Sequence, residues 1–265
     1  MTKNNTQEQG KVWFIGAGPG DPELITLKGH RLISSADLII YAGSLVPVEI
    51  ISCAKPEAKI VDSSALHLAE IHQLVRECIA TGGIVARVHT GDPSLYGALR
   101  EQMDLLAQDG IAYGVIPGVT AAFAAAAAAA VSITMPETVQ SFSITRLSGR
   151  TDVPENQGVR ELAAHGGSLA VYLSGQDVEK LTTELRAAKL PERTPILAAY
   201  RVGWPEEKLV WTTLAGLEDI IRQEKFTRQT VFLVLPGAGQ SGNASKLYDQ
   251  NFSHAFRTSK TANNI

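Results

Sequence analysis

Hydrophobic residues in the first half of the chain form short runs that alternate with longer amphipathic segments. Short apolar runs predict buried strands, here over residues 11–16, 38–41, 59–62, 84–89 and 113–116. Segments with apolar residues at helical spacing predict helices, here over residues 23–35, 67–80 and 98–107. Strands that alternate with helices in this way predict a mostly parallel sheet with right-handed crossovers.

The pattern starts again near Pro136. Further strands are predicted over residues 139–146, 168–173, 195–201, 208–213 and 230–235, and further helices over residues 177–188 and 214–222. Two of these strands are joined by a short link that contains Gly203-Trp204-Pro205-Glu206, which predicts an antiparallel pair in a mixed sheet.

We therefore predict an α/β fold with two α/β domains, over residues 11–136 and 137–239. Residues 1–10 are expected to be a disordered lead-in. The tail over residues 240–265 is rich in Gly, Ser and Asn and is expected to be mobile.

Three predicted strands of the first domain end in turns rich in glycine and proline. We name these turns loop 1 (residues 16–22), loop 2 (residues 90–93) and loop 3 (residues 117–120). The carboxyl ends of parallel strands meet at one edge of the sheet, where open α/β sheets bind ligands. The three turns together therefore predict a binding site at this edge.

Loop 1 fits the dinucleotide-binding fingerprint poorly. Counted from Gly16 and Gly18, the third required glycine falls on Asp21. The fingerprint also needs an acid at the end of the second strand, and that strand ends in Tyr41-Ala42-Gly43 instead. A nicotinamide or flavin site is therefore disfavoured, and a turn without a ligand remains the plain alternative.

Several single residues have both a functional and a structural interpretation. Asp92 suits a ligand's hydroxyl, amine or cation, and it equally suits an Asx-turn or a helix N-cap. Thr120 opens an alanine-rich run and is a candidate N-cap, while Tyr96 suits either ligand stacking or the core. His89 and His165 are interpreted as packing residues.

Composition narrows the function classes. The chain has 265 residues, is 45% hydrophobic and 19% charged, and carries a net charge of -3, which gives no basic footprint for nucleic acid. Cys53 and Cys78 lack metal-ligand spacing and are expected to be reduced core thiols. The first residues lack the apolar core of a secretion signal, and the apolar runs are too short to span a membrane. The predicted compartment is the cytoplasm.

Familiar catalytic motifs are absent from the sequence. There is no HExxH, GxSxG or P-loop pattern, and no nucleophile–base pair emerges. Loops without a nucleophile favour a reaction driven by positioning. Methyl transfer from a sulfonium donor is such a reaction, because the donor is already activated.

The motifs occur in an order that is specific to one family. Residues 12–22 and 24–29, together with Arg87-Val88-His89-Thr90-Gly91-Asp92-Pro93, Tyr96-Gly97 and Pro117-Gly118-Val119-Thr120, resemble the tetrapyrrole (corrin/porphyrin) methyltransferases over residues 11–237. The stretches over residues 41–46 and 204–208 resemble members that act on a corrin precursor.

The resemblance implies methyl transfer from S-adenosylmethionine to carbon 11 of precorrin-4, or of its cobalt form, in cobalamin synthesis. It also implies a cleft between the two domains and a homodimer. The implied cofactor contacts are Pro19, Thr90, Gly91, Asp92, Leu95, Tyr96, Thr120, Ala121, Leu173, Val202, Pro236 and Gly237.

Loop 1 would then face the tetrapyrrole, with Gly18, Gly20 and Asp21 as its contacts. Precorrins carry many carboxylates, so fixed cations are also expected at the site. The candidate cations are Lys28, Arg31, Arg87, Arg146, Arg150 and Arg201.

One position departs from part of the family. Relatives that methylate uroporphyrinogen carry an aspartate after the tyrosine of the second strand, where this chain has Ala42. No catalytic residue is therefore assigned, and no metal, nucleic-acid or membrane partner is expected. The alternatives are another precorrin carbon or another tetrapyrrole, a protein-bound diphthamide precursor, a non-catalytic tetrapyrrole carrier, and, least favoured, a nucleotide-binding oxidoreductase.

Overall fold

The computed structural model describes residues 10–239, 245, 251–253 and 255–258. The predicted lead-in, apart from Gly10, and most of the predicted tail lie outside these residues. Contacts between Cα atoms divide the chain into two compact units. Unit 1 extends to Ala124 and also contains Arg201–Glu207, and unit 2 contains Ala125–Tyr200 and the chain from Lys208 onward. The division thus falls before residue 136, and the link over residues 201–207 joins unit 1.

Unit 1 is built on a five-stranded sheet with the strand order β3-β2-β4-β1-β5. Every neighbouring pair in this sheet is parallel, which confirms the predicted arrangement. Its strands are β1 (Lys11–Gly16), β2 (Leu38–Tyr41), β3 (Lys59–Asp62), β4 (Val85–His89) and β5 (Ala112–Ile116).

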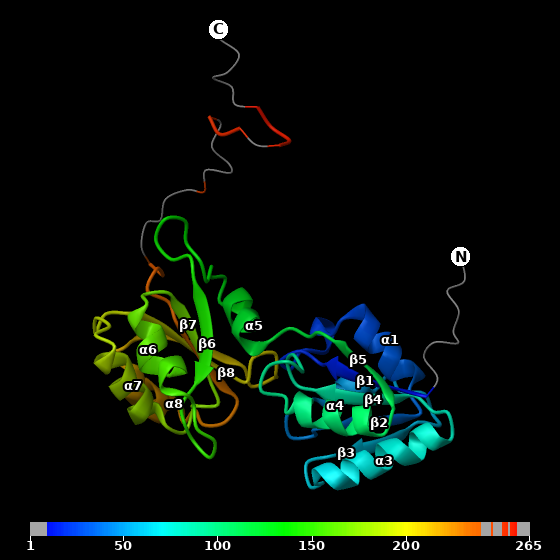
Figure 1. Ribbon diagram of the computed structural model, residues 1–265. Helices are drawn as coiled ribbons and strands as arrows, with labels where there is room; N and C mark the ends of the chain where they lie inside the picture. Colours follow the sequence, from blue (N-terminus) through cyan, green and yellow to red (C-terminus); the bar gives the residue numbers. More distant parts are fainter. Residues whose placement is uncertain (1–9, 240–244, 246–250, 254, 259–265) are drawn as a thin grey trace. The chain divides into compact units, whose positions relative to one another are not determined.

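Helices cover both faces of this sheet because successive strand residues point to opposite sides. Trp13 and Ile15 belong to a buried cluster with α1 and α2. Val12 and Phe14 belong to another cluster with α3 and α4. Figure 1 shows α1 on one side of the sheet and α3 on the other. The helices are α1 (Leu27–Ser35), α2 (Val48–Ile51), α3 (Leu68–Ala80) and α4 (Leu99–Gln108).

The first helix begins later than its apolar spacing predicts. The Asp21 carboxylate accepts the Glu23 backbone N–H at 2.8 Å and caps a short 3-10 helix, η2 (Pro22–Leu24). The Thr26 hydroxyl then accepts the Gly29 N–H at 3.0 Å and caps α1. Because these two side chains satisfy separate sets of backbone donors, the predicted helix over residues 23–35 is two elements.

Unit 2 contains a five-stranded mixed sheet with the order β6-β7-β10-β8-β9. The pair β6 and β7 is parallel and the other pairs are antiparallel, as the short link after β8 predicts. Its strands are β6 (Phe142–Arg146), β7 (Ser168–Tyr172), β8 (Pro195–Tyr200), β9 (Lys208–Thr213) and β10 (Thr230–Val234).

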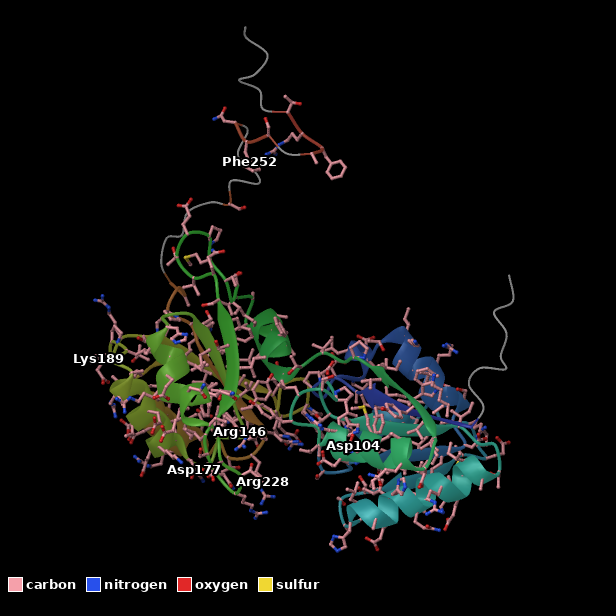
Figure 2. All side chains as sticks on the ribbon, viewed as in Figure 1. Asp104, Arg146, Asp177, Lys189, Arg228 and Phe252 are labelled. Atoms are coloured by element: carbon pink, nitrogen blue, oxygen red, sulfur yellow. The ribbon has the colours of Figure 1, made fainter. Side chains whose placement is uncertain are left out.

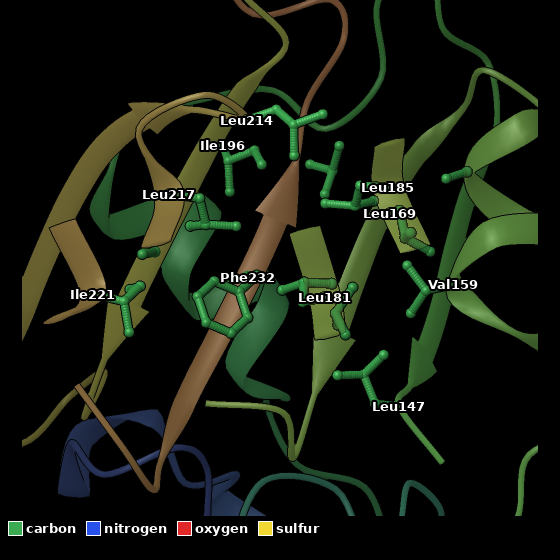
Figure 3. Close-up of a cluster of buried hydrophobic side chains, with 14 of the residues drawn as sticks. Leu147, Val159, Leu169, Leu181, Leu185, Ile196, Leu214, Leu217, Ile221 and Phe232 are labelled. Carbon is green, nitrogen blue, oxygen red and sulfur yellow. The ribbon is translucent and has the colours of Figure 1, made fainter. Parts of the chain in front are cut away.

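One face of this sheet packs against three helices. Figure 3 shows Phe232 on β10 among leucine, isoleucine and valine side chains of the strands and helices. Helix α6 is absent from the predicted elements because six residues are too few for a clear period. Helix α5 (Ala121–Ala128) contains the division between the two units. The helices and short turns that follow it in unit 2 are η3 (Glu155–Gln157), α6 (Val159–Ala164), α7 (Val178–Ala187) and α8 (Leu217–Glu224).

The strand predicted from residue 139 begins at Phe142. Residues before it form a tight turn in which the Met135 N–H donates to the Val139 carbonyl at 2.7 Å, and the reverse bond measures 3.0 Å. This exchange uses the backbone groups that a longer strand would need.

Among the described residues, no helix is long and apolar enough to cross a membrane. That part of the chain also holds no group of three or more His, Cys, Asp or Glu side chains suited to a metal ion. Cys53 and Cys78 are free and half-buried, and burial is the main cause that raises the pKa of the Cys78 thiol.

Candidate functional site

Loops 1 and 2 are joined by backbone hydrogen bonds at the carboxyl edge of the unit 1 sheet. The Ala17 N–H donates to the His89 carbonyl at 2.8 Å. Gly18 and Gly91 exchange two bonds, of 2.7 and 3.3 Å, and form an isolated antiparallel bridge. Both glycines have positive φ, +79° and +61°, which suits residues without a Cβ. The two loops therefore form one rigid element beyond the ends of β1 and β4.

Loop 3 joins this element through Asp92 and through close backbone packing. One carboxylate oxygen of Asp92 accepts the Ser94 N–H at 2.8 Å, and the other accepts the Gly118 N–H at 2.9 Å. A Cβ built at Gly16 would lie 2.5 Å from the Gly118 nitrogen, so the two backbones touch. The predicted convergence of the three loops is confirmed.

Asp92 fills the structural role that its sequence position allows. Its carboxylate closes the turn at Ser94 and also tethers loop 3. Both oxygens accept backbone N–H groups, so its geometry serves to fix the loops. Whether Asp92 also contacts a cofactor remains a prediction.

Several predicted cofactor contacts of unit 1 lie in loop 2 and the residues after it, and Thr120 of loop 3 lies next to Gly91. A Cβ built at Gly91 would meet only the Thr120 Cα, at 3.8 Å, and the Val119 carbonyl oxygen, at 4.0 Å, so the loops leave room there. Leu95 is half-buried, while Tyr96 is exposed and adopts a φ of +54°. The segments after loop 2 and in loop 3 thus contain an apolar side chain (Leu95), an aromatic ring (Tyr96) and a hydroxyl group (Thr120).

Pro19 and Val202 belong to the same unit although they lie far apart in sequence. The Trp204 indole N–H donates to the Pro19 carbonyl at 3.0 Å. Val202, two residues earlier, is buried. The sequence predicts only a short link at Trp204 and a resemblance, because no local period or turn rule connects residues 185 positions apart.

The remaining predicted cofactor residues lie in unit 2 at the ends of strands. Leu173 follows β7, is 72% exposed and has a φ of +54°. An exposed leucine in the left-handed region is uncommon and marks a position worth testing. Pro236 is half-buried after β10, and a Cβ at the buried Gly237 would lie 3.3 Å from Val139. Their contact with a cofactor remains a prediction.

The candidate substrate cations differ in their exposure and in the contacts that they already make within the protein. The Lys28 ammonium lies 5.3 Å from the centre of the Trp13 ring, and Arg31 and Arg150 are exposed. Figure 2 labels the Arg146 side chain. Its guanidinium donates to the Thr151 carbonyl and hydroxyl at 2.9 and 2.8 Å. Arg146 therefore fastens the loop after β6, and its predicted contact with substrate is untested.

Arg87 is a core residue, which corrects its prediction as a substrate cation. It is 9% exposed, and burial lowers its pKa to about 10, so it remains charged at neutral pH. Its guanidinium donates to the Gln102 side-chain oxygen at 3.1 Å and to the Ile40 carbonyl at 3.3 Å. A β-strand position in the middle of the sheet keeps this side chain away from the loops.

The loop after β2 is also fixed by a carboxylate. One oxygen of Asp62 accepts the backbone N–H groups of Gly43 and Ser64, each at 2.9 Å. These bonds, first that from Gly43, hold the pKa of Asp62 below its usual value. The residues next to Ala42 thus have a defined conformation without an acid at that position.

His89 is buried directly before loop 2, as its interpretation as a packing residue predicts. It is 7% exposed, and its ring centre lies 5.9 Å from that of Phe14. Its Nε2 has no hydrogen-bond partner within the described part of the chain. Burial first, and then the charge of Arg87, lower the pKa of His89 to about 3, so the imidazole is neutral.

This burial predicts a specific loss of stability in acid. The unfolded chain binds a proton at His89 below the ordinary pKa of 6.5, whereas the folded chain binds it only near pH 3. The free energy of unfolding therefore falls as the pH is lowered from 6.5, by about 1.4 kcal/mol per pH unit. We expect wild type to lose about 2 kcal/mol more than His89→Gln between pH 6.5 and pH 5 in urea unfolding. Equal losses in the two proteins would show that His89 does not titrate in this way.

Comparison with known proteins extends over nearly the whole chain. The family model of the tetrapyrrole (corrin/porphyrin) methylases matches residues 11–218. A cobalt-precorrin-4 C(11)-methyltransferase of Priestia megaterium is 41% identical over 251 residues, which cover 93% of this chain and 97% of the relative.

Solved structures give the same result. The X-ray structure of a cobalt precorrin-4 methyltransferase, described as a cobalamin biosynthetic enzyme, has a TM-score of 0.83 at 40% identity and covers 88% of this chain and 97% of its own. A uroporphyrin-III C-methyltransferase of Thermus thermophilus, complexed with S-adenosylhomocysteine, has a TM-score of 0.69 at 25% identity and covers 84% and 96%. With its two sheets and its three joined loops, this chain belongs to the tetrapyrrole (corrin/porphyrin) methylases.

Proposed function

We propose that this chain transfers a methyl group from S-adenosylmethionine to carbon 11 of precorrin-4 or of its cobalt form. The observation that carries the proposal is the junction of loops 1, 2 and 3 at one sheet edge, in a chain 41% identical to a cobalt-precorrin-4 C(11)-methyltransferase. The acceptor is chosen from that relative, and the donor from the family and from the relative that holds S-adenosylhomocysteine.

The residues around Gly91 suit such a donor. The open side of Gly91 lets a ligand approach the backbone, whose N–H and carbonyl are fixed by the Gly18 bridge. Thr120 and Tyr96 offer hydroxyl groups, and Leu95 offers apolar surface. A nucleoside joined to an amino acid needs this mixture of polar edges and apolar faces. We therefore assign Thr90, Gly91, Asp92, Leu95, Tyr96, Thr120 and Ala121 to the donor side, with Pro19 and Val202 beside them.

The chemistry asks the protein mainly for positioning. When bound, S-adenosylmethionine supplies a methyl group on a positively charged sulfur, which is already activated for transfer. The chain's part is to hold donor and acceptor in line, and rigidly joined loops reduce the freedom that must be lost in the transition state. Asp92 fixes loops 2 and 3, and the Gly18 bridge fixes loop 1 against loop 2.

The acceptor side is assigned to loop 1 and the cations near it. Gly18 and Gly20 are buried in loop 1, Asp21 is half-buried after them, and Lys28 and Arg31 follow on α1. Ammonium and guanidinium groups suit the carboxylates of a precorrin. Arg150 stays a candidate contact that only the sequence predicts, and Arg146 holds its loop.

Two measurements on the full chain test the proposal. Titration calorimetry with S-adenosylhomocysteine tests the donor side, and we expect saturable binding at one site per chain. Incubation with precorrin-4 and methyl-labelled S-adenosylmethionine, followed by NMR, tests the acceptor, and we expect one new methyl group on carbon 11. A label on another carbon would keep the donor and replace the acceptor. Pigment retention without consumption of the donor would indicate a carrier instead.

The same assay distinguishes the two forms of the acceptor. Parallel incubations with metal-free and cobalt-loaded precorrin-4 under identical conditions would show which is methylated faster. We expect turnover of at least one of them, and turnover of neither would contradict the proposed acceptor.

The proposal includes a homodimer in the cytoplasm, as the resemblance implies. Sedimentation equilibrium is expected to give twice the chain mass of 28.3 kDa. A single-chain mass at micromolar concentration would remove this part of the proposal and leave the reaction untouched.

A further inference from the structure

The link between β8 and β9 is a compact turn that joins unit 1. Its backbone closes on itself, because the Trp204 N–H donates to the Arg201 carbonyl at 2.9 Å and the Glu207 N–H to the Trp204 carbonyl at 3.0 Å. The Glu207 carboxylate accepts the Gly203 N–H at 2.7 Å. Arg201 and Gly203 both have positive φ, +48° and +80°. The hydrogen bonds within the turn therefore fix the position of Trp204.

The ring contacts both Arg201 and loop 1. The Arg201 guanidinium lies 4.6 Å from the centre of the indole, and its own charge is paired with Glu206 at 3.3 Å. A Cβ built at Gly20 would overlap the Cδ1 and Nε1 atoms of the indole, so the ring packs directly against the loop 1 backbone. A Cβ at Gly203 would come within 2.5 Å of the Asp21 nitrogen. Residues 203 and 204 are thus packed against residues 20 and 21 without space for a side chain.

The hydrogen bond from Trp204 fixes the middle of loop 1. One end of the loop is anchored by the Gly18–Gly91 bridge, and the other by Asp21, which caps η2. Between these anchors the Pro19 carbonyl accepts the indole N–H at 3.0 Å. The Pro19 carbonyl belongs to the Pro19–Gly20 peptide, so this bond restrains the orientation of that peptide.

We propose that Trp204 is a positioning residue for methyl transfer, which sets the conformation of loop 1 and thereby the fit of the acceptor. The inference rests on the proposed function, because loop 1 is assigned there to the acceptor side. Trp204 acts through Pro19 and Gly20 and is not itself a catalytic residue. Loops 2 and 3 are fixed by other bonds, through Asp92 and the Gly18 bridge. The donor residues of these two loops are therefore held independently of Trp204, and Pro19 is the one donor-side residue that Trp204 contacts.

The test is Trp204→Phe, which keeps an aromatic ring on Gly20 and removes the N–H donor. We expect kcat/KM for precorrin-4 to fall at least fivefold, mainly through KM, since a loop with a freed carbonyl samples other conformations. The affinity for S-adenosylhomocysteine is expected to stay within about threefold. Trp211→Phe, on β9 of unit 2, is the matched control and is expected to leave both values unchanged.

A second variant approaches the same contact from loop 1. Gly20→Ala places a methyl group where the indole lies, so it also displaces Trp204. If both changes act through one contact, kcat/KM of the double variant will fall by a much smaller factor than the product of the two single-variant factors. Losses of kcat/KM that multiply in the double variant would overturn the inference. A folded Trp204→Phe protein whose kcat/KM falls less than fivefold would also overturn it, as would an equally large loss of affinity for S-adenosylhomocysteine. The assay of the wild type separately tests the proposed function, because it measures turnover of precorrin-4 without reference to any variant.

Discussion

Gly118→Ala is expected to remove donor binding and to destabilise unit 1 by about 3 kcal/mol or more. A Cβ at Gly118 would overlap the Gly91 carbonyl oxygen and lie 2.8 Å from the Gly16 Cα. Each of these atoms is backbone, and each is fixed by a strand end or by the Gly18–Gly91 bridge. No flexible side chain can give way, so the three loops must separate. Separated loops no longer offer the common surface around Gly91.

Urea unfolding and calorimetric titration with S-adenosylhomocysteine measure the two effects. Gly149→Ala is the matched control, because a Cβ there meets nothing within 4 Å and its φ is ordinary. The control is expected to change the free energy of unfolding by less than about 0.5 kcal/mol. A Gly118→Ala protein with wild-type stability and affinity would show that the packing of loops 1 and 3 is not needed.

Most of the architecture could be predicted because local rules determine it. The strands over residues 38–41, 59–62 and 208–213 have the predicted bounds, since each is a short apolar or alternating run between turn residues. The parallel and mixed sheets follow from the lengths of the connections. The meeting of the three loops follows from parallel topology alone, which places strand ends at one edge.

The features that could not be predicted depend on contacts between distant residues. The hydrophobic pattern alone cannot divide residues 22–35 into two capped elements, because the division depends on which backbone N–H groups the Asp21 and Thr26 side chains accept. The inclusion of residues 201–207 in unit 1 depends on the fit of Trp204 to Gly20. Arg87 appears next to the loop motif in sequence, yet alternation along β4 turns it into the core. The sequence predicts which residues lie at the same edge of a sheet, but it does not predict which atoms each side chain contacts.

Asp92→Ala is the second change with a large expected effect. It removes the acceptor of two backbone N–H groups, those of Ser94 and Gly118, and so releases loop 3 from loop 2. Hydrogen bonds to a charged acceptor contribute roughly 1.5–3 kcal/mol each, and partial exposure reduces the sum, so we expect a loss of about 2 kcal/mol in stability. Because Thr120 follows the released tether, we also expect the dissociation constant for S-adenosylhomocysteine to rise at least thirtyfold.

Asp62→Ala separates these two effects. Asp62 likewise accepts two backbone N–H groups, from Gly43 and Ser64, but it does so at the end of β3 and outside loops 1 to 3. Its loss is expected to destabilise the protein while the affinity for S-adenosylhomocysteine stays within about twofold. If Asp92→Ala and Asp62→Ala weakened donor binding equally, the weakening would be a general consequence of lower stability. A selective effect of Asp92 instead means that the tether between loops 2 and 3 organises the donor side, whether or not the carboxylate touches the ligand.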